Sequence, residues 1–401
     1  MELLIYLILF LLVLIVSSTT NKLLPFLPLP LVQILLGIVI GLFLPNTDFH
    51  LNTELFLALV IGPLLFRESE EADITAILKH WRIIVYLIFP VIFISTLSLG
   101  GLAHLLWLSL PLVAFASLSE RFSFPKRVSN ILKGEGLLND ASGLVTFQVA
   151  LTAWTTGAFS LGQASSSLIF SILGGFLVGF LTAMTNRFLH TFLLSVRATD
   201  IASELLLELS LPLVTFFLAE EVHVSGIIAV VVAGILKASR FKKITLLEAQ
   251  VDTVTETVWH TVNFMLNGSV FVILGMELEM IAEPILTNPI YNPLLLLLSL
   301  VALTFVLFAI RFVMIYGYYA YRTRRLKKKL NKYMKDMLLL TFSGVKGTVS
   351  IATILLIPSN LEQEYPLLLF LVAGVTLLSF LTGLLVLPHL SDEQEESKDY
   401  L

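Results

Sequence analysis

Two carboxylates and an amide stand in the segment 132–151, which is otherwise apolar enough to enter a membrane: Glu135, Asn139 and Asp140. In a helix, Glu135 and Asn139 share one face, so the amide can hydrogen-bond the carboxylate. Asp140 points about 100° away from Asn139 and is free to face a cavity. A desolvated carboxylate takes up a proton readily, and it is also a good oxygen ligand for a small cation. One aspartate that holds either H⁺ or a cation, but not both, is the minimal machinery for exchange.

The alternative for Asp140 is a structural role, in which hydroxyls such as those of Ser142 or Thr146 satisfy the buried carboxylate. An isolated charge in a bilayer core costs roughly 2.5 to 3.5 kcal/mol on insertion scales. Such a residue therefore needs either a partner or a purpose.

The composition places these residues in a membrane protein. The chain has 401 residues, of which 57% are hydrophobic and only 13% charged. A soluble protein cannot bury that much apolar surface in a core, whereas a bilayer can absorb it. The absence of cysteine excludes disulfides and thiol chemistry. No glycine-rich phosphate-binding motif points to a nucleotide-driven pump, and nothing suggests a nucleic-acid partner.

Apolar runs of spanning length predict an all-α polytopic fold with about 13 transmembrane helices. The predicted spans are 3–18, 30–45, 52–66, 83–103, 104–119, 131–154, 165–187, 203–220, 224–238, 257–276, 294–318, 337–357 and 367–388. The first run is interpreted as a retained helix rather than a signal peptide, because no basic residue precedes it and no small-residue cleavage site follows. The polar tail, 389–401, is acidic.

The basic residues give these spans an orientation. With the N-terminus outside, 22 of the 25 Lys and Arg residues fall on the cytoplasmic side, and Lys398 in the tail joins them. This asymmetry is what the positive-inside rule demands of a protein in the cell membrane. It puts the N-terminus outside and the C-terminus in the cytoplasm. Only Arg311 and Lys346 lie within apolar spans.

The fifth predicted span is unusually tight. Arg82 and Arg121 both belong on the cytoplasmic side, so the 38 residues between them must cross the membrane twice. Two spans of about 17 to 20 residues leave no room for a loop. Pro111 in the middle of the second crossing cannot donate its backbone hydrogen bond. We therefore expect a truncated or distorted fifth span.

Five motifs, in order along almost the whole chain, resemble those of the monovalent cation/proton antiporters, in the sodium/proton exchanger branch with an Asn-Asp pair. The sequence GEGLLNDASGLV is similar to the family's ion-site segment. The other four are PLLFRES (63–69), HVSGIIAVVVAGIL (223–236), LNGSVFVILGMEL (266–278) and FSGVKGTVSIA (342–352). In the last one, Lys346 stands where the family has arginine.

The resemblance implies roles for the intramembrane polar residues. Asp140 would carry both the proton and the cation, as the ligand of Na⁺. Asn139, in place of the second aspartate of the electrogenic branch, implies electroneutral one-for-one exchange. Glu135 and Arg311 would form a buried charge pair. The chemistry of the residues supports the same pair independently of the resemblance. A buried arginine keeps its charge and needs a carboxylate partner.

The resemblance also implies an inverted-repeat fold with two broken helices that cross at mid-membrane. The second break is visible at 343–347, where Gly344 and Gly347 flank Lys346. Lys346 could neutralise the negative helix ends there, or it could merely snorkel to the surface. The first break, a Thr-Asp-Pro-like motif in the fifth span, is absent. We therefore expect part of the ion-site backbone to be missing relative to other members.

These inferences give a membrane transport domain at 1–388 and an acidic cytoplasmic tail at 389–401. Within that domain, ion-site helices would lie around 83–187 and 294–388, and interface helices around 1–66 and 203–276. Glu208, in the predicted span 203–220, is expected to be structural. The basic run at 322–335 is expected to set the topology, and lipid-headgroup binding there is an alternative.

The expected function is secondary active exchange of Na⁺, or of Li⁺ or K⁺, for H⁺ in pH homeostasis and sodium transport. The protein is expected to form a homodimer embedded in membrane lipid and to need no cofactor. Potassium/proton exchange remains an alternative, as does a transport-impaired or channel-like variant, because of the missing segment. An enzyme is not expected: Asp140 has no second intramembrane aspartate, and the histidines lie near span ends.

Overall fold

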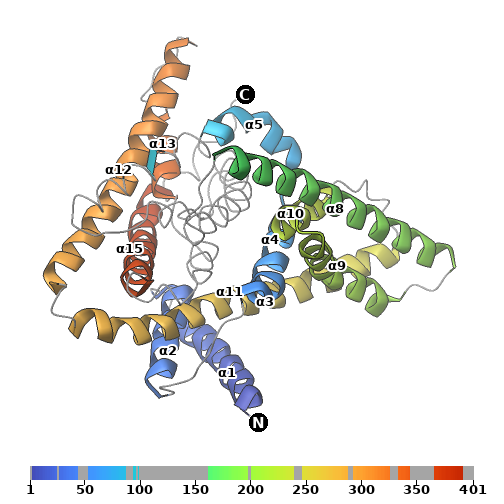
Figure 1. Ribbon diagram of the computed structural model, residues 1–401, viewed down its shortest axis with the longest axis horizontal. Helices are drawn as coiled ribbons and strands as arrows, with labels where there is room; N and C mark the ends of the chain where they lie inside the picture. The colour runs from blue at the N-terminus through green and yellow to red at the C-terminus, as the bar shows by residue number, and fades with distance from the viewer. Residues whose placement is uncertain are drawn as a thin grey trace. The chain divides into compact units, whose positions relative to one another are not determined.

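Every secondary-structure element among the described residues is helical, as the computed structural model shows (Figure 1). The structure describes residues 2–24, 27–43, 53–86, 94–95, 98, 161–196, 200–238, 246–287, 292–325, 333–343 and 365–391. Five of the helices there are long and apolar enough to cross a membrane. The all-α prediction is confirmed. The predicted fifth span, 104–119, lies outside the described residues, so the number of spans stays a prediction.

The helices have the following bounds: α1 (Glu2–Leu23), α2 (Leu29–Phe43), α3 (Thr53–Phe56), the π-helix η1 (Leu57–Ile61), α4 (Gly62–Glu70), α5 (Ile74–Tyr86), α8 (Leu161–Ser195), α9 (Ile201–Glu221), α10 (Gly226–Ala238), α11 (Leu246–Thr287), α12 (Pro293–Arg325), α13 (Met334–Phe342) and α15 (Tyr365–Ser391). α9 and α10 begin and end within two residues of the predicted spans. α11, with 42 residues, is about twice as long as its predicted span.

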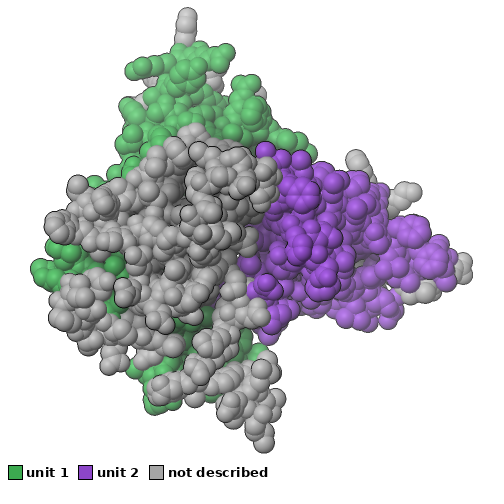
Figure 2. All heavy atoms as spheres, in the orientation of Figure 1, with its two compact units in different colours: residues 1–46, 75–143, 271–401 green, residues 47–74, 144–270 purple. Residues whose placement is uncertain are grey.

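The chain forms two compact units, which Figure 2 colours separately. Unit 1 comprises residues 1–46, 75–143 and 271–401, and unit 2 comprises residues 47–74 and 144–270. The boundary at 270 falls inside α11, so this one helix contributes to both units. The expected division into ion-site and interface helices stays a prediction.

α10 is the central helix of unit 2, and glycines bring its neighbours close. A Cβ atom on Gly179 of α8 would collide with the backbone carbonyl oxygen of Ala229. A Cβ on Gly234 of α10 would lie 2.6 Å from the Phe66 carbonyl oxygen of α4. Small residues at such positions let helix backbones approach closely, which is how helices associate in membranes. Ala229, Val230 and Ala233 of α10 are consequently fully buried.

α3, η1 and α4 form one continuous helix with a widened turn at Leu57–Ile61. The N–H of Gly62 bonds the carbonyl oxygen of Leu57, five residues earlier. Pro63 follows directly; it has no N–H, and in an α-helix its ring would collide with the carbonyl of residue 59. The π turn accommodates the proline without breaking the helix.

The turn between α9 and α10 carries a strained residue. His223 has φ 58°, and among the described residues it is the one non-glycine residue with a positive φ. Its N–H bonds the carbonyl of Glu220, and the N–H of Val224 bonds the carbonyl of Ala219. This is the helix-ending arrangement in which glycine usually occupies the left-handed position. Glu220 Oε1 accepts the N–H of Gly226 at 3.2 Å, at the start of α10.

α9 begins at a capped end outside its membrane span. Asp200 accepts the backbone N–H of Ser203 at 3.0 Å, which satisfies one of the free donors of the first turn. Hydrogen bonding by the Ser203 side chain and backbone lowers the pKa of Asp200.

In unit 1, α12 packs against α13 and α15. The buried cluster there includes Ile315 and Tyr319 of α12, Met337 and Leu340 of α13, and Leu387 of α15. Ile83 and Ile84 of α5 join the same cluster. The sequence analysis began this span at Ile83, but the helix begins at Ile74 because its first turns are amphipathic and lie ahead of the apolar run.

Candidate functional site

Of the seven predicted site residues, the structure describes Arg311. The others, namely Glu135, Asn139, Asp140, Gly344, Lys346 and Gly347, lie outside the described residues. The site can therefore be built from the elements that reach toward it: α12, which carries Arg311, and α13, which leads into the predicted break at 343–347.

Arg311 is held at the carboxyl end of α13. Its side chain is buried, and Nε donates a hydrogen bond to the Leu340 carbonyl oxygen at 3.0 Å. α13 ends at Phe342, with the N–H of Ser343 bonding the carbonyl of Leu339 at 2.9 Å. The last carbonyls of a helix carry a partial negative charge, so a cation there is stabilised. The end of this short helix falls where the sequence predicts the break to begin.

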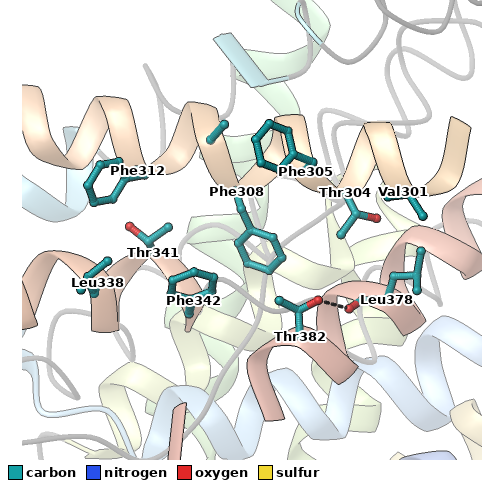
Figure 3. Close-up of a pocket in the computed structure, with 11 residues that line it drawn as sticks. Val301, Thr304, Phe305, Phe308, Phe312, Leu338, Thr341, Phe342, Leu378 and Thr382 are labelled. Carbon is teal, nitrogen blue, oxygen red and sulfur yellow. Dashed lines mark hydrogen bonds between the residues drawn. The ribbon is translucent and has the colours of Figure 1, made fainter. Parts of the chain in front are cut away.

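A cavity of about 520 Å³ lies between α12, α13 and α15 (Figure 3). Its lining is Val301, Thr304, Phe305, Phe308, Ala309 and Phe312 from α12, Leu338, Thr341 and Phe342 from α13, and Leu378 and Thr382 from α15. Figure 3 shows Phe308 extending from α12 toward Phe342, and their ring centroids are 5.4 Å apart. Four of the eleven lining residues are phenylalanines, and Phe342 among them is the last residue of α13.

The polar atoms of this lining are threonine hydroxyls. Thr304 donates to the Leu300 carbonyl at 2.8 Å, and Thr382 donates to the Leu378 carbonyl at 2.7 Å (Figure 3). Thr341 donates in the same way to the Met337 carbonyl at 2.8 Å. Each hydroxyl proton is thereby used within its own helix, and the oxygen keeps acceptor capacity. The described residues of this lining can accept hydrogen bonds and include no charged side chain.

Unit 2 contains a charge network that the sequence analysis did not predict. The Lys237 ammonium of α10 lies 2.7 Å from Glu208 Oε1 of α9 and 3.4 Å from Glu70 Oε1 of α4. Glu70 Oε2 also accepts from Arg67 at 2.9 Å. Trp259 of α11 donates its indole N–H to Glu208 at 3.1 Å. Arg67 also lies 2.8 Å from Glu71 Oε1, so the network contains two cations and three carboxylates and joins four helices.

Aromatic rings cover this charge network. The Lys237 ammonium lies 5.5 Å from the ring centroid of Phe66, and the Arg67 guanidinium lies 5.9 Å from that of Trp259. Phe66 and Trp259 are almost fully buried. Cations over ring faces gain further stabilisation when they are desolvated.

Glu208 was expected to be structural, and the structure places it in this network as the partner of Lys237 and Trp259. The three residues lie on three different helices, so no periodic spacing could connect them. The one available signal was that Glu208 and Lys237 are both charged within or beside apolar segments. Among the described residues, no group of three or more histidine or acidic side chains is placed to hold a metal ion.

The helices and the buried arginine are those of a polytopic α-helical membrane protein. The family model described as "Sodium/hydrogen exchanger, transmembrane" matches residues 7–391. The chain belongs to the sodium/hydrogen exchanger family.

Two relatives support this assignment. The chain is 33% identical to a "Sodium, potassium, lithium and rubidium/H(+) antiporter" of Bacillus pumilus, over 97% of this chain and 61% of the relative. It is 34% identical to the protein of the same name in Bacillus subtilis, over 94% of this chain and 60% of the relative. The chain thus spans about three fifths of the length of these two relatives.

The fold is that of a sodium proton antiporter of known structure. MjNhaP1 from Methanocaldococcus jannaschii superposes with a TM-score of 0.71 at 19% identity, covering 98% of this chain and 99% of that one. The predicted antiporter fold is therefore confirmed.

Proposed function

We propose that this chain exchanges Na⁺ for H⁺ across the membrane, with Asp140 alternately holding the cation and the proton. The observation that carries the proposal is the buried Arg311 bound to the carboxyl end of α13, directly before the expected helix break. A fixed positive charge at that point stabilises exposed carbonyl ends in the membrane without titrating. The family membership supports the same activity.

The exchange follows from competition at one carboxylate. When Asp140 is ionised, it offers oxygen ligands to a small cation; when it is protonated, those lone pairs are no longer available. Asn139 beside it is neutral in both states, so one Na⁺ would replace one H⁺ and the cycle would be electroneutral. Glu135, one turn earlier, is proposed as the partner of Arg311.

A second candidate is broader alkali-cation exchange, including K⁺. It is favoured by the names of the two Bacillus relatives, which specify sodium, potassium, lithium and rubidium as exchanged cations. A site made mainly of carboxylate and amide oxygens has no ligand that would strictly exclude the larger ion.

The proposed impairment of exchange rests on a shortened fifth span. The alignment with the Bacillus pumilus relative runs over 412 positions, which exceeds the 401 residues of the chain. It therefore includes positions at which this chain has no residue. A loss in the fifth span would remove backbone and hydroxyl ligands from one side of Asp140 and slow exchange.

The remaining features of the proposal follow the charge distribution and the family. The protein would be a transporter rather than an enzyme and would lie in the cell membrane with its N-terminus outside and its C-terminus in the cytoplasm. It would act as a homodimer. Twenty-two of the 25 basic residues on one side support the orientation.

Proteoliposomes with an imposed pH gradient test the activity. Added Na⁺, Li⁺ or K⁺ should collapse the gradient and restore the fluorescence of a pH-sensitive dye. Asp140→Asn should abolish the signal, because it keeps the shape but removes the exchangeable charge. Asp200→Asn is the matched control, since Asp200 is an exposed helix cap that asparagine can replace. Exchange by Asp140→Asn near the unmodified rate would overturn the assignment.

The proposed pair of Glu135 and Arg311 is tested by a double-mutant cycle. Arg311→Ala should destabilise the protein in detergent by roughly 3 to 5 kcal/mol, because it leaves a buried carboxylate unpaired. Adding Glu135→Ala should recover part of that loss. Losses that simply add in the double variant would show that the two residues are not partners.

A further inference from the structure

The helix α5 has two exposed faces of different character (α5 in Figure 1). Leu78, Trp81 and Val85 are 64%, 52% and 38% exposed. At about 100° per residue, these three side chains lie within about 60° of one another around the helix axis and form the apolar face. Lys79 and Arg82 are also exposed and lie within about the next 100°, where they form the basic face. The two faces are therefore neighbours on one side of the helix.

The remaining side of α5 is packed against protein. Ile83 and Ile84 are buried in the cluster that includes Leu340 of α13 and residues of α12. The hydroxyl of Tyr86 donates to the Met314 carbonyl oxygen of α12 at 3.2 Å. Contacts with two other helices of unit 1 therefore fix the rotation of α5 about its axis, and with it the directions in which the apolar and basic faces point.

Neither water nor hydrocarbon alone suits the exposed side of α5. In water, three large apolar side chains would stay solvated, and in hydrocarbon, two charges would lack a partner. The first turns of α5 precede the predicted span, which begins at Ile83. By the positive-inside rule, Lys79 and Arg82 belong on the cytoplasmic side. A helix with an apolar face, a basic face and an exposed tryptophan is typical of the membrane–water interface.

The basic face offers hydrogen-bond donors to an anion. Lys79 and Arg82 form no salt bridge with any residue that the structure describes. The Arg82 guanidinium lies 5.7 Å from the ring centroid of Trp81, a contact that joins the two faces. A guanidinium held over a ring keeps N–H groups for a further partner. Arginine and lysine both bind phosphate groups, and arginine does so through two parallel hydrogen bonds.

We propose that the exposed side of α5 binds an anionic phospholipid of the cytoplasmic leaflet. The basic face bonds the phosphate of the headgroup, and the apolar face lies against the acyl chains. A soluble anion would satisfy the basic face alone and leave the apolar face in water, so the two adjacent faces together favour a lipid. Because the buried side of α5 packs on α12 and α13, the bound lipid stabilises the folded protein.

The stability of the purified full chain in detergent tests this site. Phosphatidylglycerol is added, with uncharged phosphatidylcholine as the comparison, and the unfolding temperature is followed as the lipid is titrated. Phosphatidylglycerol should raise it more, because a ligand that binds only the folded state stabilises that state. In the double variant Lys79→Gln/Arg82→Gln, the phosphatidylglycerol concentration for half-maximal stabilisation should rise about 25-fold, at about fivefold for each basic residue.

The double variant Arg324→Gln/Arg325→Gln is the matched control. It removes the same charge from exposed positions at the end of α12 and should keep the parent's half-maximal concentration. An equal rise in both double variants would overturn the site on α5, as would an unchanged concentration in Lys79→Gln/Arg82→Gln. If that variant does not fold, as judged by its elution in detergent, Arg82→Gln alone gives the same test with about a fivefold rise.

Spin labels test whether the two faces lie in different media, because the chain has no cysteine of its own. Trp81→Cys and Lys79→Cys are each labelled with a nitroxide in vesicles that contain phosphatidylglycerol. The label at position 81 should relax more with oxygen, which concentrates in hydrocarbon, and the label at position 79 more with a water-soluble nickel complex. The same balance at both positions would overturn the proposal. Neither measurement uses cation exchange, so failure of the proposed function would leave both results intact.

Discussion

The helices around α10 in unit 2 and the group α12, α13 and α15 in unit 1 use different kinds of packing. In unit 2, α10 is held by glycine contacts in which helix backbones nearly touch, and its charges are closed into one network. In unit 1, α12, α13 and α15 pack through side chains, with Phe308 of α12 against Phe342 of α13, and they line a cavity of about 520 Å³. Both groups of helices are apolar, so hydrophobicity alone does not explain the difference.

The difference concerns how much rearrangement each group tolerates. A backbone-to-backbone contact has no alternative geometry, since any shift produces either a collision or a gap. Aromatic side chains beside a cavity can adopt other rotamers, and α13 ends in that same region. We therefore expect unit 2 to behave as a stiff body and the α12–α13 region to be where small structural changes are tolerated.

The largest expected effect is on the charge network of unit 2. Lys237→Met should destabilise the protein by roughly 3 to 5 kcal/mol, because it leaves Glu208 largely buried without its cation, while Glu70 keeps Arg67. The midpoint of chemical unfolding in detergent measures the loss. Adding Glu208→Gln should recover part of it. If Lys237→Met is as stable as the parent, the network does not hold unit 2 together.

A smaller effect should separate the two kinds of packing directly. Gly179→Ala in α8 places a Cβ against the Ala229 carbonyl and should cost about 1 to 3 kcal/mol. Gly317→Ala in α12 is the matched variant, since nothing lies within 4 Å of its new Cβ. It should be neutral or stabilise the helix by up to about 1 kcal/mol. Equal effects on thermal stability would contradict the contrast between the units.

The smallest effect should come from the strained turn of unit 2. His223→Gly should stabilise the protein by up to about 1 kcal/mol, because glycine adopts a positive φ without steric cost. A rise in the unfolding temperature in detergent would show it. His223→Ala is the control, since alanine keeps the strain; a gain of the same size in that variant would assign the effect to the imidazole instead.

Hydropathy predicted both ends of α9 and α10 to within two residues, but it predicted only the apolar middle of α11 and α12. α12 was predicted at 294–318 and continues to Arg325, because arginine favours helix but not membrane. α11 extends eleven residues beyond its predicted span at each end for a similar reason. The positions of these helices were therefore predictable, but their full lengths were not. Hydropathy marks the part of a helix that lies inside the bilayer, whereas the hydrogen-bonded helix continues beyond it.

Motifs and composition predicted candidate site residues, but they could not predict tertiary contacts. Arg311 was found because a lone arginine in an apolar span is costly. That its guanidinium bonds the Leu340 carbonyl, 29 residues away, depends on how α12 and α13 pack. The Lys237–Glu208 pair could not be predicted from the sequence either, because it also depends on how helices pack. The sequence did not single out Asn263, whose Oδ1 atom is closed to solvent. Whether that atom has a hydrogen-bond partner depends on the residues around it and not on its spacing in the sequence.

The widened turn at Leu57–Ile61 determines which way two charges face. One extra residue in a turn changes the angular phase of everything after it by about 100°. Arg67 and Glu70 lie after this turn. The extra residue therefore rotates both side chains about the helix axis to the side on which Lys237 lies. Pro63 carries no charge and belongs to no charge network. Through the widened turn, it nevertheless sets the direction in which the later side chains of the helix point. Replacing it with alanine would let the turn close and swing both side chains a quarter of the way around the axis.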